Sequence, residues 1–463
     1  MDGVVYLKEE RSVMLRHMPV KKLLIKLSIP AIIAMLFNAL YNLVDTIFVA
    51  WGAGEIAIGA LSIAFPVQMI VLAIGLMIGM GSASIFSRAY GRNDPEAMRR
   101  SVHTALGLNL ILSIAISGLG IVFLDDLLRI FGATSSNIGY ARDYLFYILI
   151  GLVPFSLSVV LNNLARAEGR ANVAMISMLI GALVNIILDP IFIFDFGLGL
   201  GVTGAAIATV IAKTASFVYV FTASLSKKST LNIRLSQIMI IDIKMIGEIM
   251  AIGAPTFIRN TLGAFLVVLI NNLINVYAIG DPAIYISIYG VINRMIMFLL
   301  LPGFGLVQGL QPIVGYNFGA KLNQRLHDVL GYAMRLIQGY FIVIVIISLI
   351  SADVLFMAFS RDANPYFISY GARAFRLISV GFIFISYQLV LSTVYQAMGY
   401  PIKALLISLS RQFILFIPFA FLFTYFFGLT GVWLTFLFSD LIAGLLSFAI
   451  FKYEIRTLNR KIA

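Results

Sequence analysis

The sequence contains no cysteine and very little charge. Without cysteine, its 463 residues can form no disulfide bond, thiol nucleophile or thiolate metal site. Only 12% of the residues are charged, whereas soluble domains carry about 25%. The three histidines are scattered and show no metal-ligand spacing. There is no Gly-x-x-x-x-Gly-Lys-Ser/Thr phosphate loop and no catalytic serine set, so we expect neither an enzyme nor a cofactor.

Apolar residues dominate instead, at 61% of the chain with a mean hydropathy of +0.99. This composition predicts an all-α polytopic membrane protein. Twelve apolar segments each reach the ~20 residues that a membrane-spanning helix needs. They cover residues 22–50, 56–86, 97–124, 138–164, 171–195, 201–226, 246–278, 283–316, 326–350, 366–396, 402–427 and 429–452.

The basic residues gather in one set of alternate loops and at both termini. Examples are Lys21, Lys26, Arg88, Arg92 and Lys227, whereas the opposite loops hold few basic residues. By the positive-inside rule both termini are cytoplasmic, and we expect a multi-pass protein of the plasma membrane. The net charge of +12 is thereby explained without a nucleic-acid partner.

The two halves of the chain resemble each other. Matching residues recur at a nearly constant interval, and the pairs are Pro30 with Pro255, Gly91 with Gly319, Gly169 with Gly399, and Thr203-Gly204 with Thr430-Gly431. This predicts two six-helix bundles related by a parallel internal repeat, with residues 1–228 as the N-lobe and 229–463 as the C-lobe. The design suits a secondary transporter that rocks two bundles around a central cavity; the alternative is a static channel or scaffold.

The first apolar segment carries a polar stripe. Asn38, Tyr41, Asn42 and Asp45 are spaced at i, i+3, i+4 and i+7, which places them on one helical face. An aspartate in a spanning helix costs about 2.5–3.5 kcal/mol on insertion scales, so such residues tend to be functional. We therefore expect this face to contact protein or water.

Three further polar residues are predicted to lie at the depth of Asp45. A rise of 1.5 Å per residue places Asp45 and Asp189 each about 26–28 Å along their spans, with Thr209 at a similar level. Asn185 lies one turn before Asp189 on the same face. Hard cations favour such oxygen ligands, so this pocket is a candidate site for exchange of Na⁺ or H⁺. The alternative is structural, with an acid pairing with Lys213 or capping a helix broken before Pro190.

The C-terminal half offers mainly positive charge inside its spans. Its cavity candidates are Arg259, Asn260, Arg294, Gln388 and Arg411. Arginines facing a cavity would favour a substrate that carries a carboxylate or phosphate. Alternatively, they snorkel toward the membrane surface or pair with acids across helices.

Several of these stretches resemble one transporter family. The segments are Leu40-Tyr41-Asn42-Leu43-Val44-Asp45, Asn185-Ile-Ile-Leu-Asp189-Pro190, Gly204-Ala-Ala-Ile-Ala-Thr209 and Arg166-Ala-Glu168-Gly169. They are similar to the multidrug and toxic compound extrusion (MATE) family, particularly its archaeal and DNA-damage-inducible-F-like branch. The resemblance covers essentially the whole chain.

The resemblance implies an efflux antiporter that exports small lipophilic, often cationic compounds against inward Na⁺ or H⁺. It implies that Asp45, Asn185, Asp189 and Thr209 form the N-lobe cation site and that the first helix bends at Pro30. Tyr41 and Asn162 would join the polar network, although the estimated depth places Asn162 further inward. We expect a monomer in the lipid bilayer, and the rival function is a flippase for lipid-linked oligosaccharides or lipids.

Overall fold

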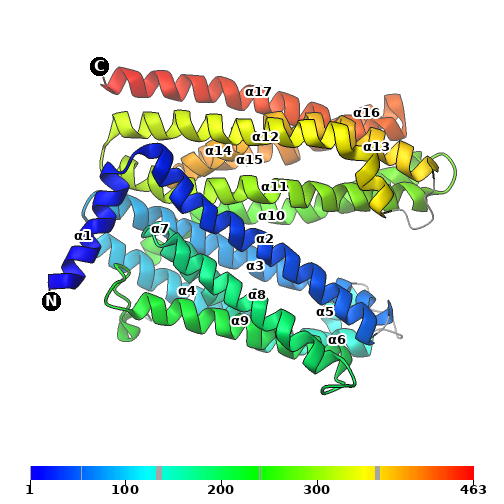
Figure 1. The fold of residues 1–463 in the computed structure, drawn as a ribbon, viewed down its shortest axis with the longest axis horizontal. Coiled ribbons are helices and arrows are strands. Elements are labelled where there is room, and N and C mark those ends of the chain that lie inside the picture. The colour runs from blue at the N-terminus through cyan, green and yellow to red at the C-terminus, as the bar shows by residue number, and fades with distance from the viewer. Residues whose placement is uncertain are drawn as a thin grey trace.

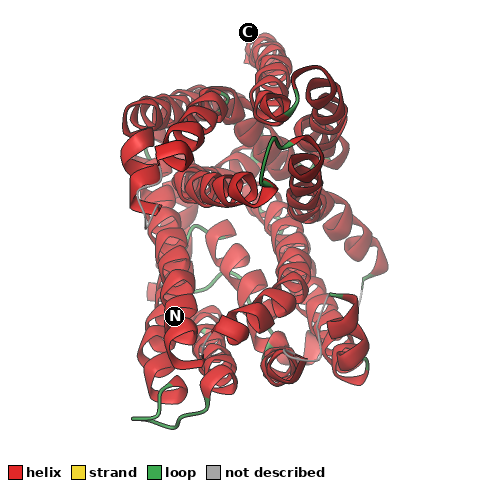
Figure 2. Cartoon of the chain, turned by 90° about the vertical axis from the view of Figure 1, so that its right-hand side faces the viewer, coloured by secondary structure: helices red, strands yellow, loops and turns green. Residues whose placement is uncertain are grey.

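Helices joined by turns and short loops build the molecule. The computed structural model describes residues 2–53, 55–131, 138–238, 240, 242–359 and 365–462. Within those residues there is no strand (Figure 2). Long apolar runs form helices here because a helix satisfies its own backbone hydrogen bonds, which lipid cannot do.

The first half of the chain holds nine of the helices among the described residues. They are α1 (Asp2–His17), α2 (Val20–Ala53), α3 (Glu55–Gly91), α4 (Pro95–Val122), α5 (Leu124–Ile130), α6 (Ile138–Ile150), α7 (Leu152–Ala167), α8 (Ala171–Ile193) and α9 (Gly201–Leu225). Pro30 lies inside α2, which the structure shows as one continuous helix through that residue.

The second half follows a short connecting segment with the 3₁₀ turn η1 (Leu235–Gln237). Its helices are α10 (Ile243–Tyr277), α11 (Pro282–Gly319), α12 (Asn323–Phe359), α13 (Pro365–Val380), α14 (Phe382–Met398), α15 (Pro401–Leu409), the π-helical turn η2 (Ser410–Leu415), α16 (Phe416–Phe427) and α17 (Leu429–Ile462). The eleventh apolar segment is therefore one run of helix with a π-helical turn in its middle.

The described helices provide between ten and twelve candidate spans, in agreement with the predicted polytopic membrane fold. Ten of the described helical stretches are long and apolar enough to cross a membrane. The pairs α6–α7 and α13–α14 pass the same test only together and are bent by 52° and 43°, and counting each pair as one span gives the predicted twelve. The sequence had predicted unbroken spans at both places. The bends fall at Gly151 and Gly381, which are separated by the same interval as Gly169 and Gly399.

Two helical bundles lie side by side at the end of the molecule that holds both termini (Figure 1). Helices α2 to α9 form one bundle and α10 to α17 the other, and the two diverge toward the opposite end. At the end with the termini, α3 packs against α10 and α2 against α11. This arrangement confirms the predicted fold class.

Small residues allow the close approach of the bundles at that end. A Cβ atom at Gly309 of α11 would overlap Ser28 of α2, and one at Gly81 of α3 would overlap the backbone of Ile249 in α10. Polar groups add cross-links: Ser28 Oγ donates to Leu306 O over 3.1 Å. The bundles are thus joined by direct backbone packing rather than by a layer of long side chains.

Candidate functional site

The two aspartates from the first and fifth spans meet inside the N-terminal bundle. Asp45 on α2 is 9% exposed and Asp189 on α8 is 0% exposed. Their carboxyl groups lie within hydrogen-bonding reach of each other. Helices α2 and α8 pack along each other, which brings together residues that are far apart in sequence.

Asn185 and Thr209 complete the same cluster. Asn185 Nδ2 donates to Asp189 Oδ1 over 2.9 Å and lies 3.4 Å from Thr209 Oγ1. Asn185 precedes Asp189 by one turn of α8, and α9 supplies Thr209 from the neighbouring helix. All four residues of the sequence-predicted site are therefore gathered at one point.

Several acceptor oxygens of this cluster have no donor. Asp45 Oδ1, Asp189 Oδ2 and Asn185 Oδ1 are buried and accept no hydrogen bond from the described residues. Buried polar atoms are normally paired, so a group of orphan acceptors fits a cation or a proton. Among the described residues, no group of three or more His, Cys, Asp and Glu side chains could hold a metal ion. The ligands available in this cluster are carboxylate, amide and hydroxyl oxygens.

The sequence left two structural roles open for these acids, capping a broken helix and pairing with Lys213, and the structure shows neither. Helix α8 continues through Pro190 to Ile193, so Asp189 does not cap a broken helix. Lys213 forms no ion pair with either acid in the described part of the chain. Its Nζ donates instead to Tyr41 Oη over 2.6 Å.

The remaining N-lobe candidates do not share one environment. Tyr41 is buried, Asn38 is half-buried and Asn42 is exposed, with Asn42 Nδ2 donating to the Asn38 carbonyl. The predicted polar stripe is thus split between a buried and an exposed part. Asn162 on α7 is buried and donates to Ser158 Oγ over 3.3 Å. No hydrogen bond among the described residues joins Asn162 to the acid cluster.

In the C-terminal bundle, Arg411 has an internal partner. Its guanidinium forms an ion pair and a hydrogen bond with Asp440, which is 1% exposed. Arg411 belongs to the π-helical turn η2 and Asp440 to α17. The structure therefore favours pairing across helices for Arg411 over a role in binding an anionic substrate.

The other C-lobe candidates are dispersed. The Arg259 guanidinium lies 5.8 Å from the centre of the Phe304 ring, and Asn260 donates to the backbone of its own helix. Arg294 is exposed, whereas Gln388 is buried with an Nε2 atom that has no partner among the described residues. These four residues do not form one polar cluster through the described contacts.

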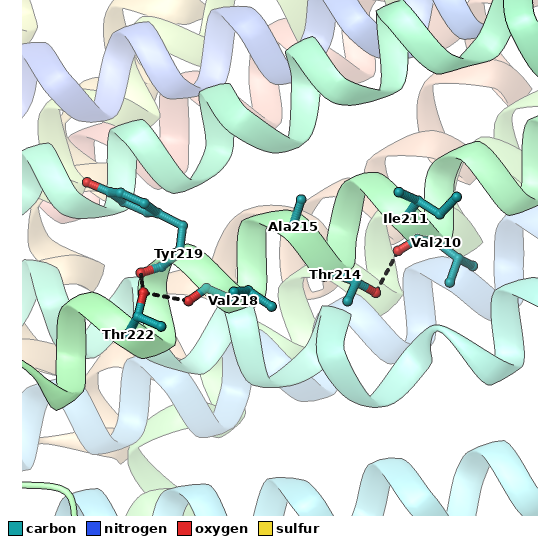
Figure 3. A pocket seen from close by; sticks show the side chains of 7 residues that line it. All are labelled: Val210, Ile211, Thr214, Ala215, Val218, Tyr219 and Thr222. Atoms are coloured by element: carbon teal, nitrogen blue, oxygen red, sulfur yellow. Dashed lines mark hydrogen bonds between the residues drawn. The ribbon is translucent and has the colours of Figure 1, made fainter.

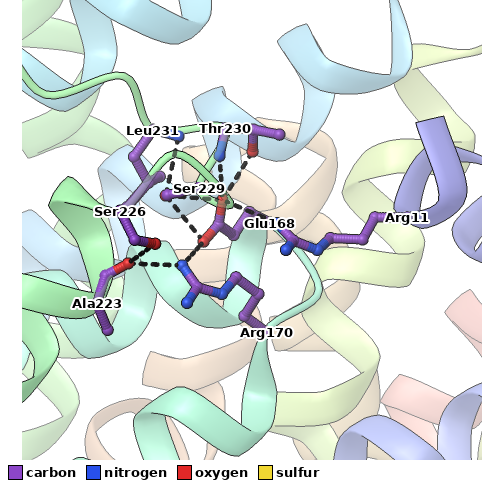
Figure 4. Close-up of polar contacts among 8 residues, drawn as sticks. All are labelled: Arg11, Glu168, Arg170, Ala223, Ser226, Ser229, Thr230 and Leu231. Atoms are coloured by element: carbon purple, nitrogen blue, oxygen red, sulfur yellow. Dashed lines mark hydrogen bonds and ion pairs between the residues drawn. The ribbon is translucent and has the colours of Figure 1, made fainter. Parts of the chain in front are cut away.

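Sequence reasoning missed a buried acid at the end with the termini. Glu168, in the turn between α7 and α8, is completely buried, and Figure 4 shows the polar groups around its carboxylate. Its carboxylate accepts bonds from Thr230 N at 2.7 Å, Ser229 Oγ at 3.1 Å and Arg170 Nη1 at 3.1 Å, with Arg11 Nη1 3.8 Å away. The signal for it was the acidic residue in Arg166-Ala-Glu168-Gly169. Through these contacts Glu168 links Arg11 of α1, and Ser229 and Thr230 of the segment after α9, to the N-terminal bundle.

A cavity of about 620 Å³ lies along α9 (Figure 3). Its lining comes from α9 alone and consists of Val210, Ile211, Thr214, Ala215, Val218, Tyr219 and Thr222. Both threonine hydroxyls donate to backbone carbonyls of the same helix. The cavity therefore presents an apolar surface and offers no free polar group from its threonines.

Comparison with known proteins gives consistent matches over nearly the whole chain. The family model named MatE matches residues 30–191 and 261–422, one stretch in each half. The chain is 29% identical to the multidrug export protein MepA of Staphylococcus aureus (strain MSSA476) over 437 residues, which is 92% of each chain. It is 27% identical to MepA of Staphylococcus haemolyticus over 455 residues, 97% of each chain.

Solved structures agree with these matches. One, described as the outward-facing conformation of a multidrug resistance MATE family transporter of the MOP superfamily, superposes with a TM-score of 0.89. That pair is 25% identical, with 96% of this chain and 98% of the other covered. A MOP superfamily transporter from Pyrococcus furiosus, described as having a binding pocket of reverse polarity, gives 0.88 at 26% identity, with 97% and 98% covered.

Proposed function

The chain belongs to the MATE family, and from this premise we propose that it is a multidrug efflux antiporter that exports small lipophilic, often cationic compounds in exchange for Na⁺ or H⁺. The relatives named as multidrug export proteins support the export of drugs. The protein is a multi-pass membrane transporter. Its residence in the plasma membrane as a monomer, with both termini cytoplasmic, is part of the proposal.

One observation carries the coupling to a cation. Asp45, Asp189 and Asn185 hold buried acceptor oxygens that no donor satisfies, at the point where α2, α8 and α9 meet. A monovalent cation or a proton would satisfy them, and its loss would leave two carboxylates facing each other in a poor dielectric. Occupancy would therefore change the relative stability of two arrangements of the bundle, as counter-transport needs.

The two lobes supply the moving parts in this proposal. We divide the chain into an N-lobe of residues 1–228 and a C-lobe of residues 229–463, which rock against each other about the packed end. Their divergence away from the termini (Figure 1) and the likeness to a relative described as outward-facing support an outward-facing state. A bend of α2 at Pro30 would accompany the change of occupancy.

The proposal is tested with purified protein in liposomes on which Na⁺ and pH gradients are imposed separately. Efflux of cationic dyes is followed alongside an anionic compound. We expect one gradient to drive dye efflux and both Asp45→Asn and Asp189→Asn to abolish it. Dye efflux that ignores both gradients in the wild-type protein would refute the antiporter.

The rival function, a flippase for lipid-linked oligosaccharides or other lipids, depends on arginines binding a pyrophosphate. Arg411 already forms an ion pair with Asp440, so it is not free to bind a pyrophosphate. The same liposomes decide the matter. Protection of Arg259 or Arg294 from a guanidine-modifying reagent by a lipid-linked pyrophosphate, but not by drugs, would favour the flippase.

A further inference from the structure

A lysine lies beside the acid pair without forming an ion pair. Lys213 is half-buried in α9, four residues after Thr209 and hence one turn further along the same face. An ammonium group inside a membrane protein is normally paired or functional. In the described part of the chain no carboxylate lies within ion-pair distance of Lys213, although its charge acts on that of Asp45.

Tyr41 and Phe155 hold the ammonium group in place. Lys213 Nζ donates to Tyr41 Oη over 2.6 Å, lies 4.4 Å from the centre of the Tyr41 ring and 5.3 Å from that of Phe155. Tyr41 is one turn before Asp45 on α2. The Tyr41 hydroxyl and two ring faces thus stabilise the ammonium group, although Asp45 follows Tyr41 by only one helical turn.

The charges of the cluster do not balance without an additional cation. Asp45 and Asp189 contribute two carboxylates, and Lys213 contributes one ammonium group. Three acceptor oxygens of Asp45, Asp189 and Asn185 remain without a donor, although Asp189 is fully buried. One further positive charge would complete both the charge balance and the set of bonds.

We propose that Lys213 is a tethered counter-cation of the Asp45–Asp189 pair. It supplies one of the two positive charges that the pair requires, so a single monovalent cation, Na⁺ or H⁺, completes the site. When that cation leaves, the ammonium group moves from Tyr41 onto the carboxylates and takes its place. Lys213 thereby fixes the number of coupling cations per cycle at one.

The lysine side chain suits this movement. Its charge lies at the end of a flexible four-carbon stem with three rotatable donors. Tyr41, which holds the ammonium group, and Asp45, toward which it would move, are one helical turn apart on α2. The titratable groups that act on Lys213 are Tyr41 and Asp45 from α2, and Asp189 from α8 and Tyr144 from α6 lie around Asp45. Tyr144 accepts a hydrogen bond from Gln68 Nε2 over 3.3 Å.

The inference rests on the proposed function, and the test separates the two. Bound cations per chain are counted in purified protein as radioactive Na⁺ at saturation and as protons taken up during acid titration. The Asp45→Asn/Asp189→Asn double variant supplies the background. We expect the wild-type protein to hold one site-specific cation and Lys213→Met to hold two. Lys213→Arg, which keeps the charge, should return to one.

A second variant keeps the test decisive if Lys213→Met does not fold. Tyr41→Phe removes the oxygen that holds the ammonium group, so Lys213 should compete more strongly and weaken the apparent cation affinity by about tenfold. The matched control is Lys452→Met on α17, whose ammonium group also lies over a ring, that of Phe448, in the other lobe. It should leave the cation count at one.

The outcomes point in different directions. A count of one in Lys213→Met, or of two in Lys213→Arg, overturns the counter-cation while the acid site stands. An unchanged cation affinity in Tyr41→Phe also counts against it. A double variant that binds cations like the wild-type protein refutes the coupling site itself, and the counter-cation with it.

Discussion

Replacing Asp189 by asparagine is the most direct test of the acid cluster. The amide is nearly isosteric with the carboxylate, and its oxygen can still accept the hydrogen bond that Asn185 Nδ2 donates over 2.9 Å. The substitution therefore removes one negative charge from a fully buried position and leaves the local packing in place. We expect folded protein that has lost its coupling cation.

The magnitude follows from the charge removed. Two unit charges about 4 Å apart attract by about 4 kcal/mol at an effective dielectric constant of 20, which corresponds to roughly a 1,000-fold change in affinity. The amide oxygen of the variant recovers part of that attraction. We therefore expect cation affinity to fall by at least about 100-fold, and gradient-driven efflux to fall with it.

The assay measures radioactive Na⁺ binding and proton uptake in detergent, and dye efflux from liposomes under each gradient. Thermal unfolding checks that the variant is folded. The matched control is Asp328→Asn, because the Asp328 side chain is 52% exposed at the start of α12. It should behave like the wild-type protein in every assay.

One result would refute the reasoning. If folded Asp189→Asn kept wild-type efflux under both gradients and wild-type cation binding, Asp189 would have no role in coupling. A loss shared equally by Asp328→Asn would show that the assay responds to net charge instead of to the site.

Three further predictions concern the end of the molecule that holds the termini. Glu168→Ala should lower stability by about 2–4 kcal/mol, because it leaves the buried Ser229 hydroxyl without its acceptor and removes one of the two acceptors of Arg170 Nη1; an unchanged melting temperature would contradict this. The Arg100 guanidinium lowers the pKa of Asp242, so the stability this pair adds is present above the ordinary aspartate pKa and lost as pH falls through the lowered value. The melting temperatures of wild-type protein and Asp242→Asn should therefore differ at pH 7, and the difference should shrink as the pH falls below the ordinary aspartate pKa; a difference that does not change with falling pH would refute it. Gly309→Val should force α11 away from α2, and cross-linking between engineered cysteines on the two helices should fall; undiminished cross-linking would exclude this packing.

The acid cluster was predictable from sequence because it follows from rules that apply to each helix separately. An aspartate inside an apolar run is costly, and counting residues from the membrane surface places Asp45 and Asp189 at one depth. What counting could not give was rotation about the helix axis. Asn42 was predicted on the same face as Asp45, yet it is exposed while Asp45 is buried. Neighbouring helices decide which part of a broad polar face is covered.

The partners of the buried charges were also beyond the sequence. Arg411 pairs with Asp440 from another helix, and Glu168 binds Thr230 of a segment that follows α9. Likewise, nothing in the spacing of Lys213 indicated that it would donate to Tyr41. Such contacts join residues far apart in the chain, so periodicity carries no information about them.

The membrane class, the candidate spans and the duplicated halves could be read from the sequence alone, because hydrophobicity and length are local properties that decide whether a segment can cross a bilayer. The tertiary structure alone decided the bends at Gly151 and Gly381, the join between the bundles and the neighbours of each charge. Those depend on how helices rotate and pack, and the free energy of packing belongs to pairs of helices rather than to either one.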